Sequence, residues 1–269
     1  MSDWTRKETL ATLPAIDVSK YAKTIQNWIL GLIPIVALLG LWHYTATYTD
    51  VPAYLLPAPL DVADRFQKEL LNGRIWEHLQ LSLGHYAMGL AWGVVLGVSL
   101  GLALGSVKIL SKLIEPLIAL LRPIPPLAWI PFAIIVIGIN TQAAAFIIGI
   151  GAFYINFYNT LSGVRSIDYK LIEAAKVLGD GSWGIIWRVI IPASMPAILT
   201  GIRISLGQGW MTVVAAEMFG IRGLGQRLME AAGLLAMDTV ITYMIVIGVM
   251  HLIMDISFRI VQNYVLRWR

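Results

Sequence analysis

The sequence predicts an all-α protein that crosses a membrane about six times. Of its 269 residues, 58% are hydrophobic and only 13% are charged, and the mean hydropathy is +0.73. Soluble domains of this size carry about 25% charged residues, so most of the surface of this protein does not face water. Several apolar runs reach the ~20 residues that a helix needs to cross a bilayer. These runs are expected to be helices, because backbone polar groups in lipid must be satisfied internally.

The composition excludes several classes of function. The chain has no cysteine, which rules out disulfides, thiolate metal sites and a cysteine nucleophile. A net charge of +4 is too small to indicate a nucleic-acid partner, and it is typical of basic loops on the cytoplasmic face of a membrane protein. The sequence contains no Gly-x-x-x-x-Gly-Lys-Ser/Thr phosphate loop and no pairing of a nucleophile with a base. The chain is therefore not expected to be an enzyme.

Residues 1–27 are predicted to form a cytoplasmic tail, and residues 28–269 a transmembrane domain. The tail has mixed charge, and the first apolar run begins only near Trp28, unlike a cleavable secretory signal. Two interpretations of the tail remain open. It lies on the membrane surface through apolar side chains such as Trp4, or it is disordered.

The first predicted span covers Trp28–Tyr48, with aromatic residues at its ends as interfacial anchors. After two prolines, Asp61–Leu71 is expected to form a short interfacial helix. Val62, Phe66 and Leu70 share one face of that helix, which gives it an apolar side.

The second predicted span, Leu81–Gly105, carries a glycine at every fourth position from residue 89 onward. These glycines are Gly89, Gly93, Gly97, Gly101 and Gly105. At this spacing they line one face of a helix and allow another helix to approach closely. Packing is the favoured interpretation of the stripe, and a surface for substrate is the alternative.

The third segment, Lys112–Gly138, follows a predicted loop at Ser106–Ser111 and is expected to be interrupted. Four prolines lie between Arg122 and Pro131. Each proline removes a backbone donor and breaks a helix. Broken backbone at membrane depth is tolerated only where protein or a water-filled cavity covers it.

Three further spans are predicted at Thr141–Tyr158, Ala193–Ala216 and Thr239–Val261. A basic connection, Leu161–Pro192, joins the first two of them. In the last span, His251 and Asp255 are four residues apart and share one face of the helix, which predicts a hydrogen bond between them. Two side chains are too few to form a metal site.

The distribution of Lys and Arg predicts the orientation. One side of the predicted membrane holds the tail, the loop around Lys108, the connection 161–192 and the basic C-terminal end. The other side holds fewer cations: Arg65, Lys68, Arg74, Arg222 and Arg227. By the positive-inside rule both termini and the connection face the cytosol.

The connection 161–192 is predicted to be a hairpin of two short helices. Ser166 is expected to cap the first helix, and Asp168 to complement its dipole. Gly179 is expected to close that helix in a left-handed conformation. Ser182 is predicted to cap the second helix, which ends at Pro192.

The hairpin offers charge and a small apolar face to a partner. The expected contact residues are Lys170, Glu173, Ala174, Ala175, Leu178 and Gly179. The residues alone support two interpretations equally: a docking element for a soluble partner, or a loop that lies on the bilayer with Trp183 and Trp187 as anchors.

The spacing within the hairpin resembles the EAA loop of ABC-transporter permeases. Glu173-Ala-Ala is followed after three residues by a glycine, and nine residues later by Val189, one residue, Ile191 and a proline. Valine and isoleucine are conservative departures from the family pattern. Leu121–Pro131, and Gly207–Glu217 with the Arg-Gly-Leu-Gly sequence that begins at Arg222, look like the permeases of the nitrate/sulfonate/taurine importer group.

This resemblance covers nearly everything from Tyr54 to the C-terminus. It implies a type I ABC importer permease fold in a bacterial inner membrane, with the hairpin as a coupling element in a cleft of an ATP-binding subunit. It further implies a homodimer of this chain, two ATPase subunits that carry ATP and Mg, and a periplasmic or lipid-anchored substrate-binding protein. The chain itself is expected to hold no cofactor.

Polar residues at membrane depth predict the translocation path, because such residues are functional suspects. The candidates are Arg122, Trp129, Gln208, Trp210 and Thr212. Two roles for Arg122 remain open, since it can attract a small anion or cap the carbonyls that the prolines free. Arg203 is expected either near this path or snorkelling toward the interface. Glu217 is expected to contact the binding protein or to pair with Arg222.

The function that follows is the transmembrane permease subunit of an ATP-driven importer for a small anion. Sulfonates such as taurine are favoured, and nitrate and bicarbonate remain open. The alternative is a stand-alone secondary transporter or channel. That class often has inverted repeats and paired broken helices, whereas this sequence has one broken segment.

Overall fold

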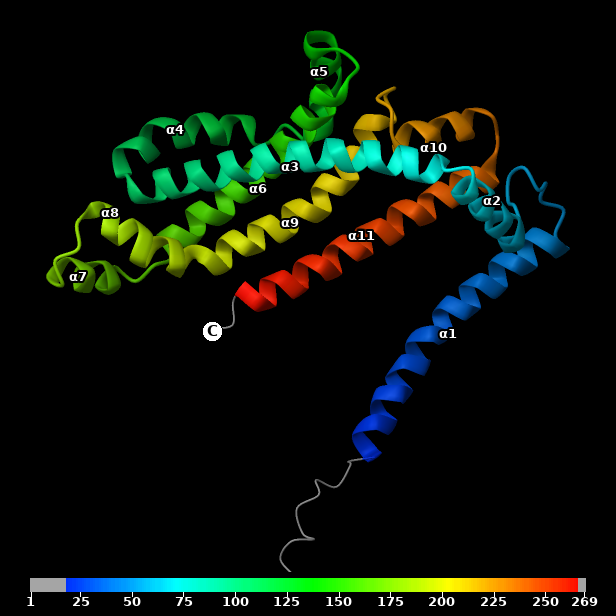
Figure 1. Ribbon diagram of the computed structural model, residues 1–269, viewed down its shortest axis with the longest axis horizontal. Helices are drawn as coiled ribbons and strands as arrows, with labels where there is room; N and C mark the ends of the chain where they lie inside the picture. The colour runs from blue at the N-terminus through cyan, green and yellow to red at the C-terminus, as the bar shows by residue number, and fades with distance from the viewer. Residues whose placement is uncertain (1–17, 266–269) are drawn as a thin grey trace, which may run out of the picture. The chain divides into compact units, whose positions relative to one another are not determined.

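The computed structural model describes the backbone of residues 18–265 and the side chains of residues 30–265. All regular secondary structure in this part of the chain is helical, as predicted (Figure 1). The chain divides into two compact units, residues 1–60 and residues 61–269. Among the described residues, five helices are long and apolar enough to cross a membrane, and a bent pair of helices adds a sixth candidate.

The first unit contains α1 (Val18–Tyr48) and the loop that follows it. The helix begins within the predicted tail, and its apolar part, Leu30–Tyr48, matches the predicted first span. Trp42 Nε1 donates a hydrogen bond to the Pro57 carbonyl oxygen at 3.0 Å, which fixes the loop against the end of the helix. The part of the predicted tail that contains Trp4 lies outside the described residues.

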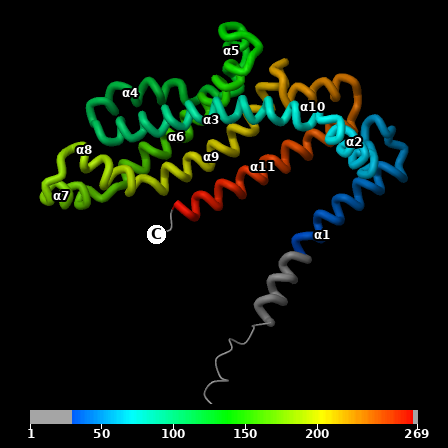
Figure 2. The backbone as a smooth tube through the Cα atoms, in the orientation of Figure 1, coloured from blue at the N-terminus to red at the C-terminus, as the bar shows by residue number. Residues whose placement is uncertain are grey.

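The core of the second unit is a layer of three long helices that run side by side (Figure 2). They are α3 (Arg74–Ser106), α6 (Thr141–Arg165) and α9 (Ile191–Glu217). Their inward faces carry the largest buried side chains, among them Phe157 and Trp210. The fourth predicted span therefore continues seven residues further than expected, from Tyr158 to Arg165.

The glycine stripe of α3 packs against α6, as predicted. A Cβ atom placed on Gly93 would lie 2.5 Å from the Gly149 carbonyl oxygen, and one placed on Gly97 would lie 2.7 Å from the Phe153 carbonyl oxygen. Real Cβ atoms do not approach backbone this closely, so the two helices reach this separation only with glycine at these positions.

The third segment is broken at its prolines, as predicted. It consists of α4 (Lys108–Leu121), the 3₁₀ turn η1 (Pro126–Trp129) and α5 (Ile130–Ile137). The helices on either side of the break are bent by 82°. The prediction of a loop at Ser106–Ser111 was wrong, because only Val107 separates α3 from α4.

The predicted end of a helix at Pro192 was also wrong. The short α8 (Ser182–Ile185) passes through a π-helical stretch, η2 (Ile186–Ile190), directly into α9. The backbone N–H of Ile191 donates to the Ile186 carbonyl oxygen five residues earlier. This wider turn allows Pro192, which has no backbone N–H, to follow without breaking the helix.

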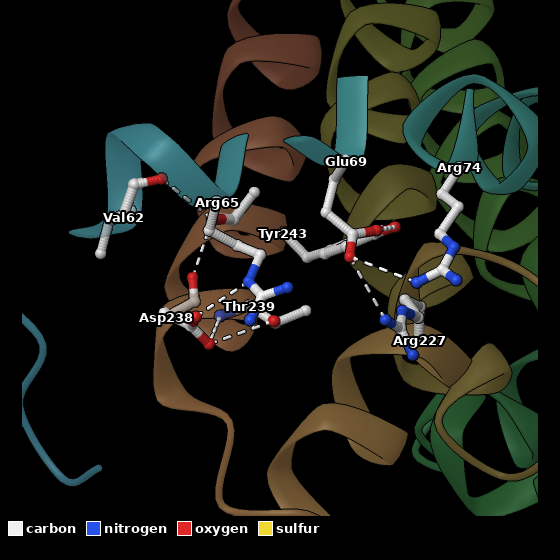
Figure 3. A network of polar contacts seen from close by, with 9 residues as sticks. Val62, Arg65, Glu69, Arg74, Arg227, Asp238, Thr239 and Tyr243 are labelled. Atoms are coloured by element: carbon white, nitrogen blue, oxygen red, sulfur yellow. Dashed lines mark hydrogen bonds and ion pairs between the residues drawn. The ribbon is translucent and has the colours of Figure 1, made fainter. Parts of the chain in front are cut away.

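At the opposite end of the layer from the hairpin, α2 (Pro59–Leu71) meets α10 (Leu224–Gly233) and α11 (Met237–Val265) through a polar network (Figure 3). Glu69 is only 2% exposed; it accepts a hydrogen bond from the Tyr243 hydroxyl at 3.1 Å and pairs with Arg227 at 3.4 Å. Burial is the largest single effect and acts to lower the pKa of Arg227, but Glu69 and Tyr243 together outweigh it and the pKa is raised. The network had not been predicted. On the predicted apolar face of α2, Val62 is buried and Phe66 is 36% exposed.

Candidate functional site

The hairpin begins with α7 (Tyr169–Val177), which is capped by Asp168. The Asp168 carboxylate accepts a hydrogen bond from the Lys170 backbone N–H at 3.0 Å. The predicted cap, Ser166, serves the preceding helix instead, because its hydroxyl donates to the Gly163 carbonyl oxygen at 2.8 Å. Asp168 thus supplies both the cap and the negative charge at the start of α7.

The elbow of the hairpin depends on Gly179. Its φ of +90° is left-handed, as predicted, and its N–H donates to the Lys176 carbonyl oxygen at 3.0 Å. The next N–H, of Asp180, donates to the Ala175 carbonyl oxygen at 3.0 Å, which completes the closure of α7. The second helix has no side-chain cap, contrary to the prediction for Ser182.

The hairpin presents an exposed apolar surface. Val177 and Leu178 are 87% and 85% exposed, and Trp183 and Trp187 are exposed beside them. Of the predicted contact residues, Ala175 is buried against the second helix, whereas these are exposed: Lys170, Glu173, Ala174, Leu178 and Gly179. Ala175 therefore anchors the hairpin, and the remaining residues form the surface that it offers.

A second feature is a cavity of about 210 Å³ beside the proline break. It is lined by residues from the break, α6 and α9: Arg122, Ile124, Pro125, Pro126, Ile148, Gly151, Tyr154, Ile155, Gln208, Gly209 and Thr212. The structure therefore brings together three residues of the predicted path, Arg122, Gln208 and Thr212.

Arg122 is held at the cavity by an aromatic ring. Its guanidinium carbon lies 4.3 Å from the ring centroid of Tyr158 on α6, in a cation–π contact. This contact leaves the edge of the guanidinium available for a second partner. Neither Tyr158 nor Tyr154 had been predicted at the site, because nothing in the sequence relates α6 to the break.

Two other predicted path residues lie away from this cavity. Trp210 is 1% exposed, and its indole N–H donates to the Ile247 carbonyl oxygen at 3.0 Å. Trp129 packs against Phe132 and Phe146. The structure therefore places both indoles in packing positions.

An ion pair joins α4 to the end of α6 that leads into the hairpin. Arg165 donates from Nη2 to Glu115 at 2.6 Å and to the Ser111 hydroxyl at 2.8 Å. Glu115 was not among the predicted residues, although a glutamate in an apolar helix is a functional suspect at membrane depth. Ser111 and Glu115 thus tie α4 to α6, and Arg122, the residue that follows α4, contacts α6 at Tyr158.

Glu217, predicted to be accessible at the end of α9, is completely buried. Its carboxylate accepts hydrogen bonds from the Ser82 hydroxyl and the Gly225 N–H, both at 2.9 Å, and lies 3.0 Å from His85 Nδ1. It does not pair with Arg222, which is exposed and contacts Glu77 at 3.0 Å. A Cβ atom on Gly223 would lie 2.1 Å from the Glu217 carboxyl carbon, which explains the glycine there.

The predicted hydrogen bond between His251 and Asp255 is replaced by ion pairs of Asp255 with Arg203 and Arg259. In the described part of the chain, no three His, Asp or Glu side chains lie together as metal ligands would.

An exposed hairpin, a broken helix and a polar cavity inside a bundle of apolar helices define a membrane permease. The family model for the inner membrane component of binding-protein-dependent transport systems matches residues 93–269. The chain belongs to this family and is a multi-pass inner-membrane permease of the ABC-importer class.

Curated relatives match along most of their length. A putative ABC transporter permease of Methanocaldococcus jannaschii is 38% identical, over 85% of this chain and 88% of the relative. The taurine transport system permease of Escherichia coli is 32% identical, over 89% of each chain. The bicarbonate transport system permease of Synechococcus elongatus is 32% identical, over 88% of this chain and 90% of the relative.

Solved structures agree on the fold. A chain of the inward-facing MetNI methionine ABC transporter superposes with a TM-score of 0.63, and the match covers 74% of this chain and 97% of that one. The two chains are 20% identical, so the likeness defines the fold alone. It is the type I importer permease fold that the resemblance in the sequence implied.

Proposed function

We propose that the chain lines the path of a small anion through the membrane and receives the force of ATP hydrolysis through its hairpin. The observation that carries the proposal is the exposed hairpin closed at Gly179, which has the spacing of a coupling loop. A permease without an ATP-binding loop of its own needs such a surface for a separate ATPase, on which ATP and Mg would be bound.

The hairpin is suited to docking because its apolar surface is rigid. Ala175 and Ile185 are buried where its two helices meet, and an ion pair of 2.7 Å between Asp180 and Arg188 braces the elbow. Exposed Val177 and Leu178 then project from a fixed scaffold, beside Lys170 and Glu173. A surface that moves as one body can transmit a push to α9, which continues from the hairpin without a break.

We further propose that the cavity at the break belongs to the path, with Arg122, Gln208 and Thr212 as its polar lining. A guanidinium beside two neutral polar groups suits a small oxyanion. Relatives named for taurine, aliphatic sulfonates and bicarbonate favour anionic substrates, with sulfonates first and nitrate a further candidate.

The assembly that we propose has two copies of this chain, two ATP-binding subunits and a substrate-binding protein. The hairpin and both termini face the cytosol, residues 1–27 form the tail, and residues 28–269 form the permease domain. The exposed Arg222, with Glu77 beside it, is offered to the binding protein on the other side. Glu217 is left out of that contact because it is buried.

Single cysteines test the path, because the native chain has no cysteine and therefore no background. We expect Gln208→Cys and Thr212→Cys to react with a small charged thiol reagent at a rate that changes when ATP is added to the reconstituted complex. Met211→Cys on the same helix is the matched control; Met211 is exposed and does not line the cavity. Equal reaction rates at all three positions would contradict the proposal.

A further inference from the structure

A second polar cavity, of about 300 Å³, lies between α9 and α11. It shares no lining residue with the cavity at the proline break. Its walls are formed by two helices: Thr200, Arg203, Ile204, Leu206 and Gly207 from α9, and His251, Met254, Asp255 and Gln262 from α11. The proposed path does not use any of these residues.

The charged groups at this cavity leave an excess of positive charge. Asp255, which lines the cavity, accepts from Arg203 Nε at 3.3 Å and from both Nε (2.9 Å) and Nη2 of Arg259. Arg259 is not itself among the lining residues, but through this contact one carboxylate serves two guanidiniums. A guanidinium carries five N–H donors. Within the described part of the chain, Arg203 contacts this carboxylate through Nε alone. Its outer nitrogens are therefore available to an anion that enters the cavity.

The cluster lies where the apolar core of a membrane ends. At ~1.5 Å per residue, Asp255 lies about 27 Å and Arg259 about 33 Å along α11 from its start at Met237. The hydrocarbon core of a bilayer is ~30 Å thick. The two arginines therefore reach the level of the lipid headgroups on the side of the membrane where the hairpin lies.

An aliphatic stripe adjoins the charged cavity on α11. Leu252, Ile256 and Ile260 are four residues apart and all exposed, and Ile204 of α9 is exposed at the edge of the cavity. Guanidiniums at headgroup level beside an exposed aliphatic stripe match the two parts of a phospholipid. A water-soluble anion would use only the first of these features.

We propose that this cavity binds the phosphate of an anionic phospholipid from the leaflet on the hairpin side. Both outer nitrogens of Arg203, and the one outer nitrogen of Arg259 that does not donate to Asp255, hold the headgroup. The acyl chains lie along the stripe of Leu252, Ile256 and Ile260. Because the excess charge is positive, a headgroup with a net negative charge binds better than a zwitterionic one.

Native mass spectrometry of the purified full-length chain tests this site, with dioleoylphosphatidylglycerol and dioleoylphosphatidylcholine as probes. We expect phosphatidylglycerol to bind in preference to phosphatidylcholine, and Arg203→Gln or Arg259→Gln to reduce that preference by about fivefold. Arg74→Gln, which removes an exposed arginine that pairs with Glu69 at the opposite end of the layer from the hairpin, is the matched control and leaves the preference unchanged. Equal binding of the two lipids by the native chain would overturn the proposal.

Two further experiments distinguish an effect of charge from one of shape, and binding of a lipid from binding of a water-soluble anion. Asp255→Asn removes the competing carboxylate at nearly constant volume, so phosphatidylglycerol binding is retained or rises; a loss of binding would contradict the site. Glycerophosphoglycerol carries the same phosphodiester without acyl chains and is expected not to displace the lipid at equal concentration. Displacement by glycerophosphoglycerol would identify a site for a soluble anion and overturn the lipid assignment.

Discussion

At the scale of single residues, Gly179 shows how one backbone conformation determines the shape of the proposed docking surface. A Cβ atom there would meet no atom within 4 Å, so the requirement for glycine comes from φ alone and not from packing. Holding a β-branched residue in this region of conformational space costs on the order of 1–3 kcal/mol. The hairpin would relieve that cost by opening its elbow.

We therefore expect Gly179→Val to leave the protein in the membrane and to lower substrate-stimulated ATP turnover of the reconstituted complex severalfold. Gly181→Val is a matched control, since Gly181 has an ordinary φ of −73° and also has open space around it. ATP turnover is measured with and without binding protein and substrate. Normal stimulation in Gly179→Val would show that the elbow does not couple the two subunits.

Among the local backbone roles, the left-handed conformation of Gly179 was predicted correctly, whereas the caps expected from Ser166 and Ser182 were not found. Roles that depend on distant partners were missed. The conformation of Gly179 was predicted correctly because a glycine that follows the last turn of a helix commonly closes that helix in the left-handed conformation. Glu217 was misplaced because its partners come from two other helices, Ser82 and His85 from α3 and Gly225 from α10. Arg122 was placed beside the break, but its aromatic partner Tyr158 could not be inferred from spacing.

At the scale of helices, the spacing of residues predicted which helix faces pack together better than it predicted where the helices end. The stripe of glycines on α3 identified a close helix contact because every fourth residue lies on one face. Pro192 predicts the end of a helix, but a proline near the start of a helical segment costs little stability when a π turn precedes it, and here the helix continues. Nothing in the sequence indicated that Glu69 is buried, because its partners lie far along the chain, on α10 and α11.

The contact between α3 and α6 predicts a stability difference within one helix. Gly93→Ala places a methyl group against the backbone of Gly149 and is expected to destabilise the fold by about 1–3 kcal/mol. Gly84→Ala on the same helix meets no atom within 4 Å and is expected to be neutral or stabilising by up to ~1 kcal/mol. Thermal unfolding in detergent measures both variants. A similar midpoint for the two would contradict the packing described for α3 and α6.

At the scale of the whole molecule, one chain supplies only half of the proposed path, because the cavity at the break is lined by a single copy of the chain. In a twofold assembly of identical chains each lining residue occurs twice around the axis. Single cysteines near Gln208 are therefore expected to form disulfides between two copies, whereas single cysteines at exposed positions of α1 such as Leu38 are not. Crosslinking in membranes, read as dimers on a non-reducing gel, measures this. Dimers from Leu38 alone would place the axis elsewhere.

The central claim is that this permease moves its substrate only when a separate ATPase acts on the hairpin. The most direct measurement is uptake of labelled taurine or bicarbonate into proteoliposomes that contain this chain, its ATP-binding subunit and its binding protein. We predict uptake that requires ATP and the ATP-binding subunit, falls severalfold in Gly179→Val and is retained in Gly181→Val. Uptake at the same rate without ATP or the ATP-binding subunit, driven by an ion gradient alone, would contradict the account and indicate a transporter that works on its own.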